Sequence, residues 1–142
     1  MRDVFFIGKQ QTVFVEPDII YMKMSGDVTA EEGLAINDQH REYVVGREVV
    51  YYLIDFTELE SVPAPVRKAA SETIKEFPLE GLAIFGAPLK AKVLAKLILT
   101  AMKLFKGDAA GPPVAFVDTE EQALAWIEKR RGEVAKKREH AA

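Results

Sequence analysis

The segment at residues 49–57, VVYYLIDFT, constrains the fold more strongly than any other part of the chain. Its first six residues are all apolar, and several are β-branched or aromatic. A short run of this kind is typical of a strand that is buried on both faces of a parallel sheet. Open α/β sheets present their sites at the carboxyl ends of such strands, so function is sought first between Asp55 and Arg67.

The composition is typical of one soluble domain without metal or redox chemistry. At 142 residues the chain has the size of a single domain with one core. It has no cysteine, and its only imidazoles are His40 and His140, so we predict no metal site and no cofactor. His40 is expected to be a helix residue that is half-buried or has its hydrogen bonds satisfied, rather than a ligand. The lack of a signal-peptide pattern and of disulfides predicts a cytoplasmic protein.

Turn residues and capping patterns divide the chain into alternating elements. The sequence EPD at 16–18 separates two β-rich runs and predicts a hairpin, because proline presets the dihedral angle of a turn. TAEE at 29–32 and TEEQ at 119–122 match the capping box that begins a helix. The predicted strands are residues 12–15, 19–25, 49–56, 82–85 and 113–117, and the predicted helices are residues 30–45, 65–77, 89–106 and 119–131 or beyond.

This order of elements, ββαβαβαβα, predicts an α/β fold with a mostly parallel sheet, alternating helices and an N-terminal antiparallel hairpin. We find no linker or internal repeat, so residues 1–142 are predicted to form one domain. Its core spans about residues 9–131. Residues 132–142 form a charged C-terminal extension, whose last seven residues, KKREHAA, are expected to be mobile.

Four segments carry a resemblance to a known family: EPDIIYMKMSGDVTAEE, VVYYLIDFTELE, GLAIFGAP and PVAFVDTEEQALAWI. Together they resemble the bacterial SpoIIAA-like group, whose fold is that of the STAS domains of sulfate transporters and anti-sigma-factor antagonists. The resemblance covers about residues 9–131, and its motifs are structural. It implies a STAS-like cytosolic module without enzymatic activity. Related STAS domains act as protein-interaction switches, and some bind nucleotides or lipids.

The resemblance also indicates where a regulatory switch would lie. STAS antagonists carry a phosphorylated serine in an Asp-Ser-Ser-Gly pattern after the buried strand. Here the corresponding loop reads SVPAP at residues 61–65, the expected position falls near Ala64, and the loop has no Asp-Ser pair. Thr57 and Ser61 remain as candidate acceptors, although a strand-end threonine and a turn serine are the simpler interpretation.

Asp55 admits two interpretations. Its carboxylate could act as a general base or a cation ligand, or it could hold the following turn by accepting hydrogen bonds from loop amides, which we favour. Glu58 adds acidity, but the loop contains no His, Cys or Lys partner for nucleophilic catalysis. We therefore predict no catalytic residue, and instead a candidate interaction loop that comprises Asp55, Thr57, Glu58, Ser61 and Arg67.

The predicted helix at residues 89–106 carries a basic stripe and a wide apolar arc. The arc exceeds the roughly 100° that packs a helix on a sheet, which predicts further cover by a neighbouring helix, a homodimer contact, an apolar ligand or a membrane surface. A membrane contact is disfavoured, because it would remove this helix from the core. The stripe comprises Lys92, Lys96, Lys103 and Lys106. The candidate pocket or dimer surface comprises Leu97, Ile98, Met102 and Phe105 together with Trp126 of the final helix.

Charge limits the class of partner. Residues 1–87 hold 8 Lys and Arg against 15 Asp and Glu, whereas residues 88–142 hold 11 against 7. The isoelectric point of about 5.5 argues against a nucleic-acid partner. We predict a non-enzymatic cytoplasmic module with a regulatory role that binds a protein partner, with itself in a homodimer as one form. The alternative is a carrier or sensor of an apolar, lipid-like small ligand in a pocket under the helix at residues 89–106.

Overall fold

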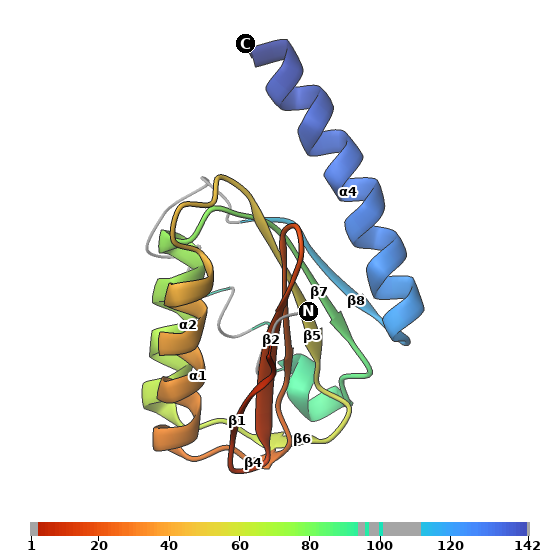
Figure 1. Ribbon diagram of the computed structural model, residues 1–142. Coiled ribbons are helices and arrows are strands. Elements are labelled where there is room, and N and C mark those ends of the chain that lie inside the picture. Colours follow the sequence, from red (N-terminus) through yellow and green to blue (C-terminus); the bar gives the residue numbers. More distant parts are fainter. Residues whose placement is uncertain (1–2, 94–95, 97–99, 101–111, 142) are drawn as a thin grey trace.

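A six-stranded sheet forms the centre of the computed structural model, which describes residues 3–93, 96, 100 and 112–141 (Figure 1). Strand β2 is antiparallel to both of its neighbours, β1 and β3, and β3, β5, β7 and β8 are parallel. This arrangement confirms the predicted α/β fold with an N-terminal antiparallel hairpin. In sheet order the strands are β1 (Phe5–Ile7), β2 (Gln10–Val15), β3 (Ile19–Lys23), β5 (Val50–Asp55), β7 (Leu79–Phe85) and β8 (Val114–Val117).

Helices cover both faces of this sheet. In Figure 1, α1 (Ala30–Tyr43) and α2 (Ala64–Glu76) lie side by side on one face, and α4 (Glu120–Ala141) lies on the other. Residues 89–93 are also helical, so the helix predicted at 89–106 begins where expected. Residues 94–95, 97–99 and 101–106 of that prediction lie outside the described residues.

Local sequence signals account for several of these boundaries. The side chain of Thr29 accepts from the amide of Glu32, and the Glu32 carboxylate accepts from the amide of Thr29, which completes the predicted capping box of α1. Gly46 follows α1 with a φ of +75°, a conformation that glycine adopts without steric cost. Pro65 occupies the first turn of α2, where its missing amide proton is not needed.

The two faces of the sheet have separate cores, and β5 contributes to both. Tyr52 and Ile54 pack beneath α1 and α2, whereas Tyr51 and Leu53 pack beneath α4. All six residues of β5 are buried, as the apolar run predicted. Alternation along β5 therefore decides which of its side chains can reach a site on a given face.

Three short strands were not predicted. β1 lies at the edge of the sheet, and β4 (Gly26–Asp27) pairs with β6 (Leu59–Ser61) in a separate two-stranded sheet. Each has only two or three residues, too few for an alternating pattern to stand out. β7 also begins at Leu79, earlier than the predicted residue 82, because Leu79 pairs with Val50.

The C-terminal extension is helical up to Ala141, because α4 continues through it and projects beyond the sheet (Figure 1). Val134 is buried, Arg131 pairs with Asp18, and Arg138 pairs with Glu48. These contacts tie the extension to the loops at one end of the sheet. Among the described residues, no helix is long and apolar enough to cross a membrane.

Candidate functional site

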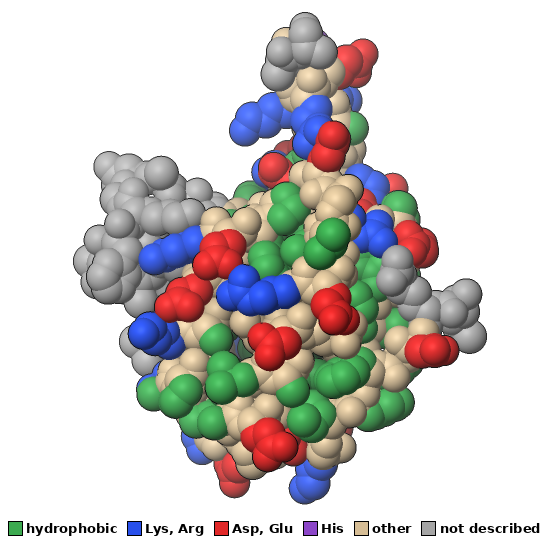
Figure 2. Space-filling model, turned by 60° about the vertical axis from the view of Figure 1, so that its left-hand side comes forward, with side chains coloured by type: hydrophobic (Ala, Val, Ile, Leu, Met, Phe, Trp, Pro, Cys, Tyr) green, Lys and Arg blue, Asp and Glu red, His purple; other side chains and the backbone are tan. Residues whose placement is uncertain are grey.

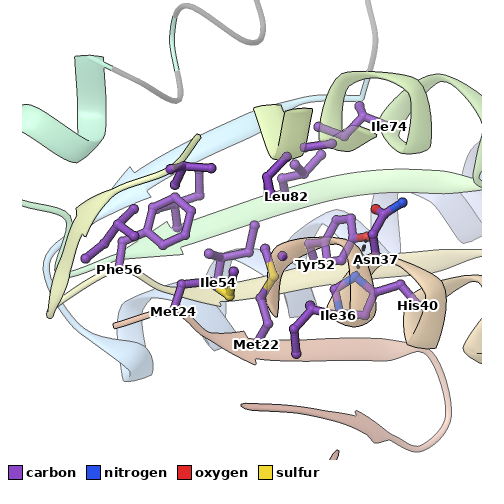
Figure 3. A pocket seen from close by; sticks show the side chains of 16 residues that line it. Met22, Met24, Ile36, Asn37, His40, Tyr52, Ile54, Phe56, Ile74 and Leu82 are labelled. Atoms are coloured by element: carbon purple, nitrogen blue, oxygen red, sulfur yellow. Dashed lines mark hydrogen bonds between the residues drawn. The ribbon is translucent and has the colours of Figure 1, made fainter. Parts of the chain in front are cut away.

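An apolar pocket lies between the sheet and the helices α1 and α2 (Figure 3). It has a volume of about 110 Å³ and is lined by sixteen residues, of which only Asn37, His40 and Tyr52 carry polar side-chain atoms. Met22 and Met24 lie along one wall. Methionine is unbranched and polarisable, so such a wall adapts to differently shaped apolar groups.

The periodicity of each element points a row of side chains into this pocket. Tyr52 and Ile54 are two residues apart on β5, and Ile36 and His40 are four apart on α1. The row on α2 has the same spacing of four residues and comprises Val66, Ala70 and Ile74.

Gly33 sets the distance between the two helices that wall the pocket. A Cβ atom at Gly33 would lie 2.4 Å from Cγ2 of Val66, far inside van der Waals contact. Only glycine therefore lets α1 approach α2 this closely. Deeper along the same interface, the Thr73 hydroxyl donates to Oδ1 of Asn37 at 2.7 Å, which fixes the orientation of the Asn37 amide.

His40 is held by a chain of hydrogen bonds with one possible direction. The Thr12 hydroxyl lies 2.6 Å from the carbonyl oxygen of Tyr21 and must donate its single proton there. Thr12 Oγ1 therefore accepts from Nε2 of His40 at 2.9 Å. Nδ1 of His40 then has no proton and accepts from the Tyr52 hydroxyl at 2.9 Å. The imidazole is thus a neutral Nε2–H tautomer.

Burial favours the uncharged form of both titratable groups in this hydrogen-bond chain, His40 and Tyr52. His40 is 2% exposed, and burial lowers its pKa to about 3. Burial also raises the pKa of Tyr52 far above its usual value. Burial therefore disfavours the charged form of each group at neutral pH, which suits a structural role for the pair.

The predicted interaction loop does not converge on one site. Asp55 accepts from the amide of Thr57 at 2.9 Å and from its hydroxyl at 2.6 Å, which holds the turn after β5. Glu58 forms an ion pair with Lys23 at 2.8 Å. Asp55 also lies on the α4 face of the sheet, because it follows Ile54, which lines the pocket on the opposite face.

Two residues of the loop, Ser61 and Arg67, line an open groove of about 640 Å³. The other wall of this groove is the helical turn that begins at residue 89, where Leu89 is 78% exposed and Val93 is 50% exposed. The remaining lining residues are Glu60, Val62 and Lys90. The groove therefore combines exposed apolar side chains with two cations and one carboxylate.

Of the residues in the candidate pocket or dimer surface, the structure describes only Trp126. This indole packs over Gly81, where an added Cβ would lie 3.0 Å from Cζ3 of the ring, so Trp126 is half-buried at the edge of the core beneath α4. The other candidates lie outside the described residues: Leu97, Ile98, Met102 and Phe105.

The basic stripe is described at two of its four lysines. Lys92 is half-buried, and Lys96 is exposed with its Nζ 5.9 Å from the ring centroid of Phe116. Lys103 and Lys106 lie outside the described residues. On the face shown in Figure 2, acidic and basic side chains are interspersed with apolar ones, without a field of one sign.

Sequence reasoning missed the pocket between α1, α2 and the sheet. It placed an apolar pocket under the helix at residues 89–106 instead. The local signals were Gly33 within the pattern of α1 and the alternating Met22 and Met24, but none of them indicates which elements pack together. Among the described residues, no group of three or more potential metal ligands is close enough to hold an ion.

Comparison with known proteins identifies the fold. The SpoIIAA-like family model matches residues 19–128. A crystal structure of an uncharacterised DUF3478-family protein with a SpoIIAA-like fold, from Shewanella loihica PV-4, superposes with a TM-score of 0.57. The two chains are 18% identical, and the match covers 89% of this chain and 94% of the other. No curated protein matches.

Proposed function

The chain belongs to the SpoIIAA-like family, and from this premise we propose that it is a non-enzymatic module that binds a small apolar ligand in the pocket between α1, α2 and the sheet. The family name specifies a fold and no reaction. The proposal is the carrier or sensor function predicted from the sequence, moved to a different pocket. A cytoplasmic location is part of the same proposal.

The single observation that carries this proposal is the apolar lining of the pocket. Thirteen of the sixteen lining residues have no polar side-chain atom, and methionines form part of the wall. A dry cavity of about 150 Å³ with similar walls binds benzene, so a volume of about 110 Å³ suits a short hydrocarbon segment. The protons of Tyr52, His40 and Thr12 are already donated within the chain of hydrogen bonds, which favours an apolar occupant.

A pocket-filling variant tests this function. Ala70→Leu places three further carbon atoms into the pocket, whereas Ala69→Leu adds the same atoms at a neighbouring position of α2 that does not line it. We expect benzene and 1-octanol to give saturation-transfer NMR signals with the wild type and with Ala69→Leu, and weak signals with Ala70→Leu. Equal signals from all three proteins would exclude the pocket as the binding site.

A second candidate function, regulatory interaction with a protein partner, is favoured by the half of the α4 face that none of the described helices covers. α4 packs on β5, β7 and β8. On the same face, Val15 pairs in register with Ile19 and Phe6 pairs with Gln11, which places both side chains beside the area that α4 covers. Val15 is 43% exposed and Phe6 is 65% exposed.

We propose that the partner for the exposed surface around Val15 and Phe6 is another copy of the chain. One symmetric contact between two such surfaces would cover both of them at once. Sedimentation velocity of the wild type should show a dimer that Phe6→Lys dissociates. Val45→Lys is the matched control, because Val45 is also strongly exposed but follows α1 at the end of the sheet. A monomeric wild type would remove this candidate.

A further inference from the structure

The apolar pocket and the open groove share one residue, Val62. Val62 follows β6 and precedes α2, so it lies where the chain passes from the floor of the groove to the wall of the pocket. Val62 thus lies between the pocket and the groove, and a ligand that reaches from one into the other has to pass its side chain. The chemistry of the groove next to Val62 then determines what the other end of the ligand can be.

The guanidinium of Arg67 is fixed at this junction. Its Nη1 donates to the carbonyl oxygen of Val62 at 2.8 Å, and this bond uses one of its five N–H donors. Arg67 forms no ion pair with a residue that the structure describes. A planar guanidinium with free N–H groups is the side chain best suited to bind a carboxylate through two parallel hydrogen bonds.

The charges that line the groove favour a single negative charge. The groove is lined by two cations, Lys90 and Arg67, and one carboxylate, Glu60, so its lining has a net charge of one positive unit. Lys90 likewise has no ion-pair partner among the described residues, and the first turn of α2 contains no acidic side chain that would compete for Arg67. An anion placed between Arg67 and Lys90 would be held mainly by these two cations.

The groove also offers apolar cover for the part of a ligand outside the pocket. Leu89 and Val93 are four residues apart in a helical turn, so they lie on one side of it. Both are exposed in the protein alone. An alkyl chain that leaves the pocket past Val62 would cover them and gain hydrophobic free energy.

From these contacts we infer that the ligand is a monoanionic amphiphile, with its apolar tail in the pocket and its carboxylate bound by Arg67 and Lys90 in the groove. This inference rests on the proposed function, since it requires that the pocket binds the tail. It adds the chemical class of the ligand, its orientation and two specificity-determining residues.

Ligands with the same eight-carbon tail and different head groups test the inference. Isothermal titration with octanoate, 1-octanol and octylamine should give octanoate about tenfold tighter than 1-octanol, as one charge-assisted hydrogen-bond pair would provide, and octylamine weakest. Arg67→Gln and Lys90→Gln should each weaken octanoate towards 1-octanol and leave 1-octanol unchanged. Lys68→Gln, an exposed cation of α2 that does not line the groove, should change neither.

The outcomes separate this inference from the proposed function. Equal affinities for octanoate and 1-octanol, unaffected by Arg67→Gln, would overturn the carboxylate site and leave the apolar pocket standing. Failure of all three ligands to bind the wild type would overturn both. Tighter binding of octyl phosphate than of octanoate would overturn the assignment of a monoanion and point to a phosphate head group.

Discussion

The hydroxyl of Tyr52 donates to Nδ1 of His40 across 2.9 Å, and the other ring nitrogen donates to Thr12. These bonds join β5, α1 and β2 beside the pocket. Since every partner is buried, removal of one group leaves another without a hydrogen bond.

Tyr52→Phe should therefore destabilise the protein by about 1–3 kcal/mol, because Nδ1 of His40 would lose its donor in a buried environment. Tyr21→Phe removes a hydroxyl from a half-buried tyrosine on the opposite face and should cost less than about 0.5 kcal/mol. Urea unfolding measured by circular dichroism compares the two. A Tyr52→Phe protein as stable as the wild type would contradict the assigned hydrogen bond from the Tyr52 hydroxyl to Nδ1 of His40.

The buried imidazole also predicts a pH dependence of stability. The pKa of His40 is lowered to about 3 in the folded protein, whereas the unfolded value is about 6.5. Between these values only the unfolded chain takes up the proton. Stability due to neutral His40 is therefore complete above about pH 6.5 and is lost as the pH falls, by up to about 1.4 kcal/mol per pH unit.

His40→Gln removes this titration, so its stability should fall less steeply than that of the wild type between about pH 7 and pH 5. The measurement is the urea midpoint at several pH values in that range. This range lies above the ordinary pKa values of carboxylates, which limits their contribution. Parallel curves for the two proteins would show that His40 does not titrate as proposed.

Gly33 and Gly132 give a matched pair of substitutions with opposite signs. Gly33→Ala would force a methyl group against Val66 and should cost about 1–3 kcal/mol. Gly132 lies in α4 with nothing within 4 Å of an added Cβ, so Gly132→Ala should stabilise the protein by about 0.5–1 kcal/mol. Thermal unfolding distinguishes them, and Val66→Ala combined with Gly33→Ala should recover part of the loss.

Two ion pairs of α4 should differ in strength. Arg131 binds both carboxylate oxygens of Asp18, at 2.9 and 2.6 Å, whereas Arg138 reaches Glu48 through one contact between largely exposed side chains. Arg131→Gln should cost about 1 kcal/mol, and Arg138→Gln less than about 0.5 kcal/mol. Chemical denaturation with urea at low salt provides the comparison; equal losses would mean that the bidentate geometry adds nothing.

The elements that sequence predicted well are those specified by neighbouring residues. The apolar run of β5 needs burial on both faces, and the bonds between Thr29 and Glu32 form within one turn of chain. β4 and β6 could not be predicted this way, since Gly26 pairs with Leu59 across a helix and a strand.

The candidate site likewise depends on contacts between residues that are far apart in the sequence, which local patterns do not predict. Ser61 and Arg67 do line a groove, but their partners in it, Leu89 and Lys90, come from a later part of the chain. The pocket likewise joins residues from α1, α2 and four strands, so its volume depends on how the helices dock. Asp55 was included in the predicted interaction loop because it is close in sequence to Ser61 and Arg67. Side chains alternate along a strand, so Asp55 lies on the face of the sheet opposite to the pocket.

The hydrogen bonds that run from Tyr52 through His40 and Thr12 to the Tyr21 carbonyl all point in one direction, and this has a consequence for how a ligand enters the pocket. Each of its protons is already donated, so the chain presents only lone pairs to anything that approaches it. A carboxylate inserted head first would meet electron-rich oxygen atoms there, and it would lose its water without compensation. This part of the lining therefore favours the hydrocarbon end of such a molecule over its carboxylate end.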